Sequence, residues 1–370
     1  KNTNYNPPRG KTTGNRKLNH ADNPKIDIFE WQMDLLRHFQ HAQLFQLLVR
    51  DLEGALLLET LSDHLTELAD LVLDTALSLA WSGLKQKHRD TPAFAIIGYE
   101  KLGGKELGYV SDLDIVFLYN DDDPNAAEIY TKLGQSINAW LTPQTSAGSL
   151  YETDLRLRPN GASGLLVHAM KAFAQYQRKQ AWAWAWAWAW EHQALTRARF
   201  VTGNQHVADI FEQSRKEILC QPRNLIELKQ DILMMREKML DAHPNSTTLF
   251  DIKHDRGGII DVEFMVQCLV LGHACNHPQL TGNIGNIALL KLAAELGLIN
   301  RDTTKKVRMA YREFRRTQHR LRLNSETDLT GTPSVEDPVQ QQYTRVKAND
   351  LNNARIVVLQ LWQEVFGNYN

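Results

Sequence analysis

The stretch GGKELGYVSDLDIVF (residues 103–117) carries two aspartates, Asp112 and Asp114, at the head of an apolar run. In a β-strand, side chains alternate, so Asp112, Asp114, Val116 and Leu118 would share one face. A strand edge that is merely solvated would stay polar along its length, whereas this face continues as apolar. The pattern therefore favours two carboxylates at one end of a strand that is buried on both sides.

Two carboxylates on one strand face predict a metal site. Their Cα atoms would be about 6–7 Å apart from the strand rise, and like charges this close resist joint ionisation unless a cation neutralises them. Mg²⁺ suits such a pair because it takes one or two carboxylates and fills its shell with water and phosphate oxygens. We therefore predict Asp112 and Asp114 as ligands of Mg²⁺.

A glycine pair, Gly103–Gly104, follows the apolar run AFAIIGY (93–99). Without a Cβ atom, each glycine lets backbone N–H groups approach a phosphate closely. The stretch is neither a Walker loop, since GK[ST] is absent, nor a GxGxxG motif. The glycine pair is a more specific sign of a phosphate-binding site because it lies seven residues before the Asp-x-Asp strand.

A third acidic residue lies in YETDLRLRP (151–159). Period-2 alternation predicts Asp154, Arg156 and Arg158 on one strand face. Asp154 could complete a two-metal site, and the arginines could bind phosphate oxygens with fork geometry. The alternative is that Arg156 and Arg158 simply pair with Asp112, Asp114 or Glu152.

The rest of the chain predicts an α+β core between two helical parts. Ser62 is a good N-cap for the second of two amphipathic helices. The pattern predicts strands for three runs: AFAIIGY, DIVFLYN and SLYETDLRLRP. It predicts helix for EIYTKLGQSINAWL and for most of the chain after Met170. We predict a flexible lead-in (1–25), a helical segment (26–88), a catalytic core (89–200) and a C-terminal helical bundle (201–370).

The repeat AWAWAWAWAW (181–190) holds five of the nine tryptophans. Alanine and the helical flanks favour a helix, in which Trp182, Trp186 and Trp190 are spaced i, i+4. A duplicated stretch accounts for the repeat better than a functional stacking platform does.

Bulk composition excludes several classes of protein. The net charge of −1 gives no global field toward nucleic acid or an anionic membrane, and the sequence has no apolar run of 18 residues. Three cysteines without a CxxC pair favour a reducing compartment, which predicts a cytoplasmic location. Cys268, Cys275, His273 and His277 match no zinc spacing.

The order of these motifs resembles the nucleotidyltransferase superfamily that includes DNA polymerase β-like enzymes. Four stretches are similar to the glutamine synthetase adenylyltransferase family: GYEKLGGKELGYVSDLDIVFLY, LYETDLRLRPNGASGLLV, WEHQALTRARFV and FDIKHDRGGIIDVEFMVQCLVL. Members are large bifunctional enzymes with two similar nucleotidyltransferase halves joined by a regulatory region. One half attaches AMP to a tyrosine of glutamine synthetase, and the other removes it by phosphorolysis.

The resemblance implies a polymerase β-like core with a small mixed sheet in a mostly helical chain. It implies ATP as substrate, glutamine synthetase as protein substrate, and a P-II signal protein as a further candidate partner. The implied site has metal-binding, catalytic aspartates (Asp112, Asp114 and Asp154) and nucleotide-binding residues (Gly103, Gly104, Ser111, Arg156 and Arg158).

Only one catalytic core is present, and ELGYVSDLDIVFL and WEHQALTRAR resemble the AMP-adding half. The removing half more often reads SSD-D and WERYA at these places. The alternatives are the removing half, a small-molecule nucleotidyltransferase, or a non-catalytic nucleotide sensor.

Three further features allow two interpretations each. RGGIIDVEF places Asp261 and Glu263 in a first helical turn, either facing the site or as solvated acids. The basic segment 301–323 is either a partner-binding face or a solvated surface. His192 and Gln193 either line the nucleotide site by resemblance or fill the core of a helix.

Overall fold

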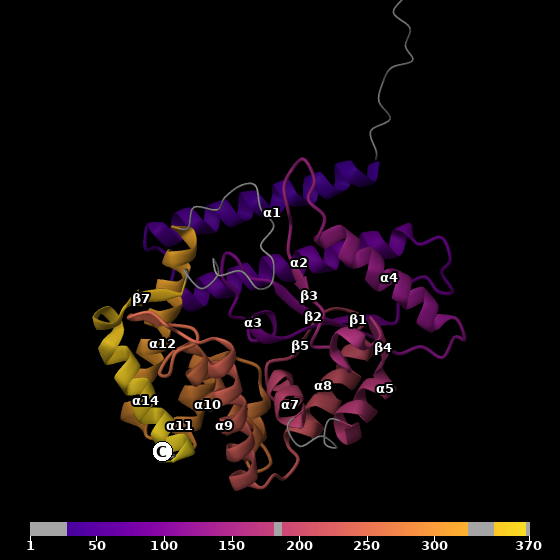
Figure 1. Cartoon of the computed structure of the whole chain (residues 1–370). Helices are drawn as coiled ribbons and strands as arrows, with labels where there is room; N and C mark the ends of the chain where they lie inside the picture. The colour runs from indigo at the N-terminus through magenta and orange to yellow at the C-terminus, as the bar shows by residue number, and fades with distance from the viewer. Residues whose placement is uncertain (1–27, 181–186, 325–343, 368–370) are drawn as a thin grey trace, which may run out of the picture.

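Two long helices precede the sheet, as their apolar spacing predicts. The computed structural model describes residues 28–180, 187–324 and 344–367. Helix α1 (Ile28–Leu52) lies beside α2 (Leu58–Gly83), and Figure 1 shows α1 as the outermost element of this part of the molecule. The predicted lead-in, residues 1–25, lies outside the described residues.

Ser62 is not the N-cap of the second helix, and that prediction is wrong. Helix α2 begins one turn earlier, at Leu58, so Ser62 is an interior, buried residue. Its hydroxyl donates to the carbonyl of Leu107 at 3.0 Å instead of capping a helix end. A serine that suits a cap can also bond to a distant backbone group, and here tertiary packing decides.

The sheet has five strands in the order β3-β2-β1-β5, with β4 also paired to β2. Strand β2 is antiparallel to β1 and parallel to β3 and β4, while β5 is antiparallel to β1. The bounds are β1 (Phe94–Gly98), β2 (Leu113–Tyr119), β3 (Thr153–Asp154), β4 (Val167–Ala169) and β5 (Arg199–Gly203). The predicted strands AFAIIGY and DIVFLYN are confirmed, as is the helix between them and the third strand, α4 (Ala126–Leu141).

Each face of β2 belongs to a different hydrophobic cluster, which is why its apolar run is nearly continuous. Leu113, Ile115 and Phe117 pack with α1, α2 and α4. Val116 and Leu118 pack with helices that follow the sheet in sequence, including α5 (Met170–Gln175), α7 (Ala187–Thr196) and α8 (Gln205–Leu219). Figure 1 shows these two groups of helices on opposite sides of the sheet.

The predicted strand SLYETDLRLRP is much shorter than its alternating pattern suggests. Pairing with β2 covers only Thr153 and Asp154, and turns follow. The chain reverses at Asn160 and Gly161, which have φ values of 63° and 57°. Asn and Gly tolerate this left-handed backbone well, so local turn chemistry overrides the alternation.

The strand β5 lies in a segment that the sequence pattern assigned to helix. It ends at Gly203, whose φ is 120° and where a Cβ atom would lie 2.3 Å from the carbonyl oxygen of Phe94. Only glycine allows the neighbouring strand this close. The run RFVT, rich in aromatic and β-branched residues and ended by glycine, is a strand signal that the helical flanks obscured.

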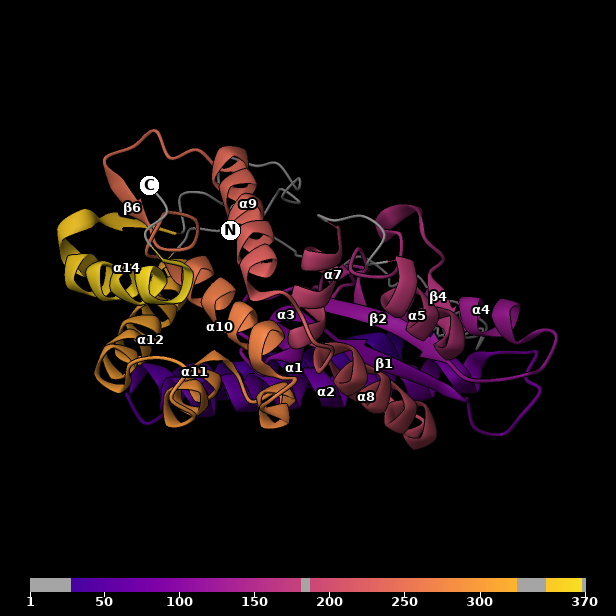
Figure 2. The ribbon, with the colours of Figure 1, turned by 90° about the horizontal axis from the view of Figure 1, so that it is seen from below.

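The C-terminal part is helical, as predicted, apart from the two-stranded sheet of β6 (Leu249–Asp251) and β7 (Arg345–Lys347). Figure 2 shows these helices beside the five-stranded sheet. Their bounds are α9 (Leu225–Ala242), α10 (Ile259–His273), α11 (Asn286–Glu295), α12 (Arg301–Leu323) and α14 (Asn352–Phe366). Residues 187–190 of the Ala-Trp repeat are helical, as predicted, and residues 181–186 lie outside the described residues.

The structure confirms a mostly helical α+β fold with a small mixed sheet. The domain boundaries at residues 88 and 200 stay predictions. One hydrophobic cluster joins strand residues such as Ile97 and Val116 to helices as late in the chain as α14. No helix in the described part of the chain is long and apolar enough to cross a membrane.

Candidate functional site

The predicted aspartates meet where β2 and β3 begin to pair. Asp114 is the second residue of β2 and lies opposite Asp154 in the parallel register. Asp112 directly precedes β2 and is exposed, while Asp114 and Asp154 are half-buried. The pairing of two neighbouring strands therefore brings the third carboxylate to the first two, although 40 residues of sequence separate Asp114 from Asp154.

Asp114 has the most perturbed electrostatics of the three aspartates. Burial raises its pKa to about 8, and the negative charges of Glu100, Asp154 and Asp112 add to the shift. Lys101 opposes it only partly. A half-buried carboxylate among like charges, at the end of a strand, is typical of a functional site.

Asp154 is held by an arginine of its own turn. Arg156 donates from Nε to both carboxylate oxygens, at 3.1 and 2.9 Å, and its backbone N–H donates to Oδ1 at 2.8 Å. Burial acts to raise the pKa of Asp154, but these hydrogen bonds and the Arg156 charge outweigh it and hold the pKa below its usual value. Arg158 donates to the backbone carbonyls of Gly164 and Ala162.

The two arginines therefore do not extend a strand face beside Asp154, and that geometric prediction is wrong. β3 ends at Asp154, and the turn redirects both side chains. Arg156 binds Asp154, whereas the structural alternative expected Asp112, Asp114 or Glu152 as its partner. Its guanidinium is largely exposed and lies beside the aspartates, so its predicted contact with phosphate stays open to test.

The acidic residues suit a divalent cation by their chemistry. The negative charges of Glu100, Asp154 and Asp112 add to burial in raising the pKa of Asp114, and a bound cation would offset that repulsion. Oxygen donors of this kind are what Mg²⁺ takes. Among the residues that the structure describes, no three His, Cys, Asp or Glu side chains converge as a ready-made metal cage. A site that completes its shell with water and phosphate needs no such cage.

The glycine pair is explained by close packing. Gly103 ends the short helix α3 (Glu100–Gly103), and a Cβ atom there would lie 1.8 Å from the carbonyl oxygen of Arg197. The N–H groups of Gly103 and Gly104 already donate to Tyr99 and Glu100 carbonyls, each at 2.8 Å. The argument that these two N–H groups are free to receive a phosphate is therefore wrong. Ser111 likewise uses its hydroxyl locally, accepting from the N–H of Gly108 at 3.0 Å.

We predict that Gly103→Ala lowers the free energy of unfolding by about 2–3 kcal/mol, because backbone atoms cannot move aside for a methyl group. Gly83→Ala is the matched control, since no atom lies within 4 Å of the new Cβ at that helical position. Urea unfolding followed by circular dichroism measures both variants. Equal midpoints for the two variants would contradict the packing role.

Three cations, Lys101, Lys253 and Arg322, form a basic cluster beside the aspartates. Lys101, from the same turn as Glu100, is half-buried, and burial together with repulsion from Arg322 and Lys253 lowers its pKa to about 7. Arg322 in turn is electrostatically coupled to Asp112. The cations repel one another, and the neighbouring carboxylates repel one another. An anionic ligand bound at the cations and a metal ion bound at the carboxylates would each reduce this repulsion. Sequence reasoning missed Lys101, although it lies within the quoted GYEKLGG stretch.

The turn that carries Lys101 has a strained backbone. Glu100 has a φ of 46°, in the left-handed region, which is uncommon for residues other than glycine. The turn is tied to β2 because the N–H of Tyr99 donates to the Asp114 carbonyl at 2.8 Å. Strain of this kind persists only where surrounding contacts fix it, and it concentrates at functional sites.

A buried ionic network also holds the turn that carries Glu100 and Lys101. Arg197 donates to Glu106 at 2.7 Å and to Glu263 at 3.3 Å, and its Nε donates to the Glu100 carbonyl at 3.2 Å. Glu106 also accepts from Asn286 of α11, at 2.8 Å, and from Tyr311 of α12, at 3.3 Å. The loop after the glycine pair is thereby joined to α10, α11 and α12. No spacing rule could reveal these partners, because they lie up to 205 residues from Glu106.

His192 and Gln193 are core residues of helix α7. His192 is fully buried and donates from Nε2 to the Gln177 carbonyl at 3.1 Å, while Arg223 donates to its Nδ1. Burial lowers the pKa of His192 to about 3, with the Arg223 charge second, so the ring is neutral. Gln193 donates to Gln267 of α10 at 2.8 Å. These contacts favour the interpretation that both residues fill a helical core.

The RGGIIDVEF stretch begins α10, and both of its acids form ion pairs, Asp261 with Arg236 and the partly buried Glu263 with Arg197. Asp261 is fully buried, accepting from Arg236 Nε at 2.6 Å and from the Gly257 N–H at 2.6 Å. Arg236, also fully buried, donates in addition to the His254 carbonyl at 2.7 Å. The pair fixes the turn between β6 and α10, which also carries Lys253 of the basic cluster.

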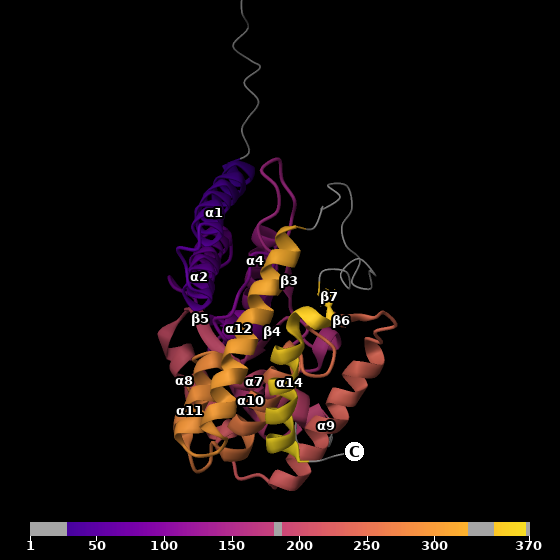
Figure 3. The same ribbon diagram turned by 90° about the vertical axis from the view of Figure 1, so that its left-hand side faces the viewer.

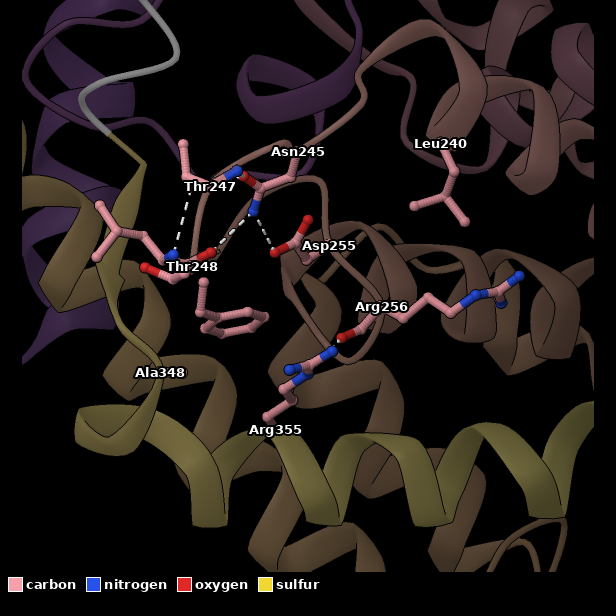
Figure 4. A pocket seen from close by; sticks show the side chains of 10 residues that line it. Leu240, Asn245, Thr247, Thr248, Asp255, Arg256, Ala348 and Arg355 are labelled. Carbon is pink, nitrogen blue, oxygen red and sulfur yellow. Dashed lines mark hydrogen bonds between the residues drawn. The ribbon is translucent and has the colours of Figure 1, made fainter.

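A separate cavity of about 390 Å³ lies between the end of α9, the strand β6 and the start of α14 (Figure 4). Arg355 donates there to the Arg256 carbonyl at 3.0 Å and lies over the Phe250 ring, and Asn245 donates to Asp255 at 2.8 Å. None of the candidate aspartates lines this cavity. We therefore assign it no part in the site.

The comparison with protein families agrees with this geometry. The glutamate–ammonia ligase adenylyltransferase family matches residues 13–214, more than half of the chain, including all three aspartates and the glycine pair. The chain belongs to this family. A second family, GlnD PII-uridylyltransferase, matches residues 227–329, the segment from α9 to just beyond α12.

Curated relatives extend the match over nearly the whole chain. The protein of Nitrosomonas europaea is 66% identical over 97% of this chain and 38% of its own length. The protein of Aromatoleum aromaticum is 53% identical over 86% of this chain and 34% of its own length. The protein of Chromobacterium violaceum is 50% identical over 91% of this chain and 35% of its own length. All three are named bifunctional glutamine synthetase adenylyltransferase/adenylyl-removing enzyme. The chain thus spans little more than a third of the length of these relatives.

Proposed function

We propose that this chain transfers AMP from ATP to a tyrosine hydroxyl of glutamine synthetase, releasing pyrophosphate and so regulating nitrogen assimilation. The observation that carries the proposal is the convergence of Asp114, its partner Asp154 and the basic cluster at the head of β2, in a chain of this family. The names of the relatives support both the substrate and the class of reaction, but they leave both halves of the bifunctional enzyme open.

The residues divide between metal and phosphate binding. Asp112 and Asp114 would hold Mg²⁺, with Asp154 as third carboxylate. When bound, Mg²⁺ would neutralise charge on the triphosphate and stabilise the developing charge at the α-phosphoryl group. Lys101 and Arg322, which are coupled to the aspartates and to each other, would bind phosphate oxygens, and Lys253 would add to the positive charge. Arg156, which donates to Asp154, would orient that carboxylate, and it is also a proposed phosphate ligand.

The attacking hydroxyl of the substrate tyrosine needs to lose a proton, since its pKa is near 10. A Mg²⁺ ion beside the hydroxyl would lower that pKa. Alternatively, Asp154 would accept the proton, since its lowered pKa keeps it ionised at neutral pH.

The decisive experiment incubates the chain with glutamine synthetase, Mg²⁺ and ATP labelled in the α-phosphate. The proposal expects label on a glutamine synthetase tyrosine, located by peptide mass spectrometry. Adenylylated glutamine synthetase with inorganic phosphate is tested in parallel, and release of ADP there without forward labelling would assign the removing activity. Nucleotide binding without either reaction would favour the sensor.

We predict that Lys101→Met lowers kcat/KM for ATP roughly 10- to 100-fold, because a half-buried cation next to the acidic cluster is lost while an unbranched side chain of similar length remains. Steady-state kinetics with ATP as the varied substrate measures this. Lys132→Met, at an exposed ion pair of α4, is the control and is expected to be unchanged. Equal kinetics for both variants would remove Lys101 from the site.

P-II and the cytoplasmic location stay predictions. A P-II protein is one candidate partner in the same labelling reaction, where its addition would change the rate of AMP transfer if it binds this part of the enzyme.

A further inference from the structure

Asp112 lies at the end of a loop, outside the strand that fixes its neighbour. Asp114 belongs to β2, whereas Asp112 is exposed and directly precedes that strand. Its position therefore depends on how the backbone is held on either side. After Asp112, the N–H of Leu113 donates to the Glu152 carbonyl at 2.9 Å. Before it lies the segment 106–111, which we name the Asp112 loop.

One face of α12 follows the Asp112 loop. Arg315, His319 and Arg322 are spaced i, i+4 and i+7, so they lie on the same side of the helix, and we name them the α12 row. Arg315 donates to the Glu106 carbonyl at 2.6 Å, and Arg322 donates to the Val110 carbonyl. Seven helical residues rise about 10 Å, within the roughly 13 Å that four loop residues can span. The loop can therefore run alongside the row.

His319 fills the middle of the α12 row. It is buried, and its ring lies so close to Gly108 that a Cβ atom there would be 2.8 Å from Nε2. The Tyr109 ring meets the imidazole edge-on, with centroids 5.6 Å apart. Nε2 has no hydrogen-bond partner in the described part of the chain, and a buried polar atom of this kind calls for an explanation. The ring therefore supports the loop by its shape.

The N-terminal helices hold the Asp112 loop from its other side. Ser62 of α2 donates to the Leu107 carbonyl at 3.0 Å, and the Tyr109 hydroxyl donates to Asp51 of α1 at 2.9 Å. Hydrogen bonds to the loop thus alternate, with residues 106 and 110 bonded to α12 and residues 107 and 109 bonded to α1 and α2. Figure 3 shows α12 (orange) beside α2 (indigo). The loop is gripped between two helical layers.

We propose that the α12 row positions Asp112 for metal binding, with His319 as its central positioning residue. His319 acts through Gly108 and Tyr109, which lie four and three residues before Asp112. Metal ligands have to be held within about 0.5 Å of their binding geometry. Substitution of the residues that orient such ligands typically weakens metal binding about 10- to 100-fold. The proposal rests on the proposed function, since it requires Asp112 to be a metal ligand.

The α12 row joins two segments that match different families. The Asp112 loop lies within residues 13–214, and α12 lies within residues 227–329. Arg312, one residue before the turn that carries the row, also donates to Glu59 of α2 at 2.7 Å. The C-terminal helices would therefore contribute to the site by fixing a loop of the core, without supplying a metal ligand of their own.

Binding of Mn²⁺ tests the proposal without any need for AMP transfer. Mn²⁺ takes carboxylate and water ligands as Mg²⁺ does, and the electron paramagnetic resonance signal of the free ion is lost on binding. The chain is titrated with Mn²⁺ in the absence of nucleotide. His319→Ala is expected to raise the Mn²⁺ dissociation constant about 10-fold, because the loop loses its central support. Asp114→Asn is the reference for loss of a metal ligand.

Gly108→Ala tests the same contact from the loop, without opening a cavity. The three atoms nearest to the added Cβ all belong to the His319 ring, and Gly108 has no positive φ that would strain alanine. This variant is also expected to bind Mn²⁺ about 10-fold more weakly. In Gly108→Ala/His319→Ala the methyl group enters the space that the ring leaves, so binding should be at least about 3-fold tighter than in either single variant. A double variant that binds no better than the single variants would overturn the proposal.

Phe314→Leu is the matched control on the same helix. Phe314 is fully buried, but its ring packs against Phe250 of β6. The variant should lower the unfolding temperature and leave Mn²⁺ binding unchanged. Circular dichroism and thermal unfolding verify that all variants fold. If His319→Ala and Phe314→Leu weaken Mn²⁺ binding equally, the effect is general loosening and the proposal is overturned.

A cycle with Asp112→Asn shows whether His319 acts through Asp112. In the Asp112→Asn chain, binding rests on the other two aspartates, and His319→Ala is expected to have little further effect. A further loss of about 10-fold there would overturn the proposal.

Asp114→Asn separates this proposal from the proposed function. If Asp114→Asn weakens Mn²⁺ binding and His319→Ala does not, the metal site stands and only the positioning role is overturned. If Asp114→Asn leaves Mn²⁺ binding unchanged, the metal site itself is contradicted, and the positioning role is overturned with it.

Discussion

Asp114→Asn is expected to lower AMP transfer on the order of 10³-fold or more while the chain remains folded. The substitution keeps the size of the side chain and removes the negative charge that would bind Mg²⁺. Asp114 is the best placed of the aspartates, because it is anchored in β2 and lies opposite Asp154. The measurement is transfer of the labelled AMP group to glutamine synthetase, at saturating ATP.

The unfolding temperature provides a second measurement on Asp114→Asn. The pKa of Asp114 rises from an ordinary 3.8 to about 8, so between these values the folded chain holds a proton that the unfolded chain has released. A carboxylate with a raised pKa therefore costs stability as pH rises through this window. Without Mg²⁺ at pH 8, the asparagine variant is expected to unfold at the same or a higher temperature than wild type.

The control is Asp122→Asn, at an exposed aspartate in the loop after the same strand. It should leave both activity and stability unchanged. Added Mg²⁺ should raise the unfolding temperature of wild type and of this control more than that of Asp114→Asn. Full activity of Asp114→Asn would contradict the assignment of the site.

The largest loss of stability is expected from Asp261→Ala, about 3–5 kcal/mol in the free energy of unfolding. The substitution leaves the Arg236 guanidinium buried without its carboxylate, and it removes the acceptor of the Gly257 N–H. Urea unfolding of the variant measures the effect.

A neighbouring ion pair provides the matched comparison. Arg256 and Glu237 join the same turn to the same helix α9, but both are about half exposed. Glu237→Ala is therefore expected to cost less than about 1 kcal/mol. The double variant Arg236→Met/Asp261→Leu should recover much of the loss, since well-packed apolar residues can replace a buried pair. If Asp261→Ala is no worse than Glu237→Ala, the buried pair does not hold the turn.

The sequence was most informative where one local pattern decided the structure. Alternation around Asp114 correctly predicted two buried faces for β2, because each face meets a different hydrophobic cluster. The same alternation failed beyond Asp154, where Asn160 and Gly161 adopt left-handed backbone and end the strand. Periodicity describes what a face can bury, whereas turn chemistry decides where the chain stops being a strand.

The candidate site was predictable only in part. Its aspartates follow one another in a recognisable order, but the glycine pair serves close packing against Arg197. Lys101, Lys253 and Arg322 come from three distant segments, so only the fold shows that Lys101 acts on Asp114, that Arg322 is coupled to Asp112, and that Lys253 and Arg322 both repel Lys101. Likewise, nothing in the local pattern around Glu106 indicates that it is buried or which residues it bonds.

The contacts of Glu106 have a consequence for how the chain reaches its native state. Asn286 and Arg315, which hold the loop that bears Glu106, follow it by 180 and 209 residues. Closing such long loops is slow, so contacts of this range form late in folding. A nascent chain can therefore complete its sheet before the loop that bears Glu106 has met its partners in α11 and α12, and the candidate site gains Arg322 only once α12 has been made.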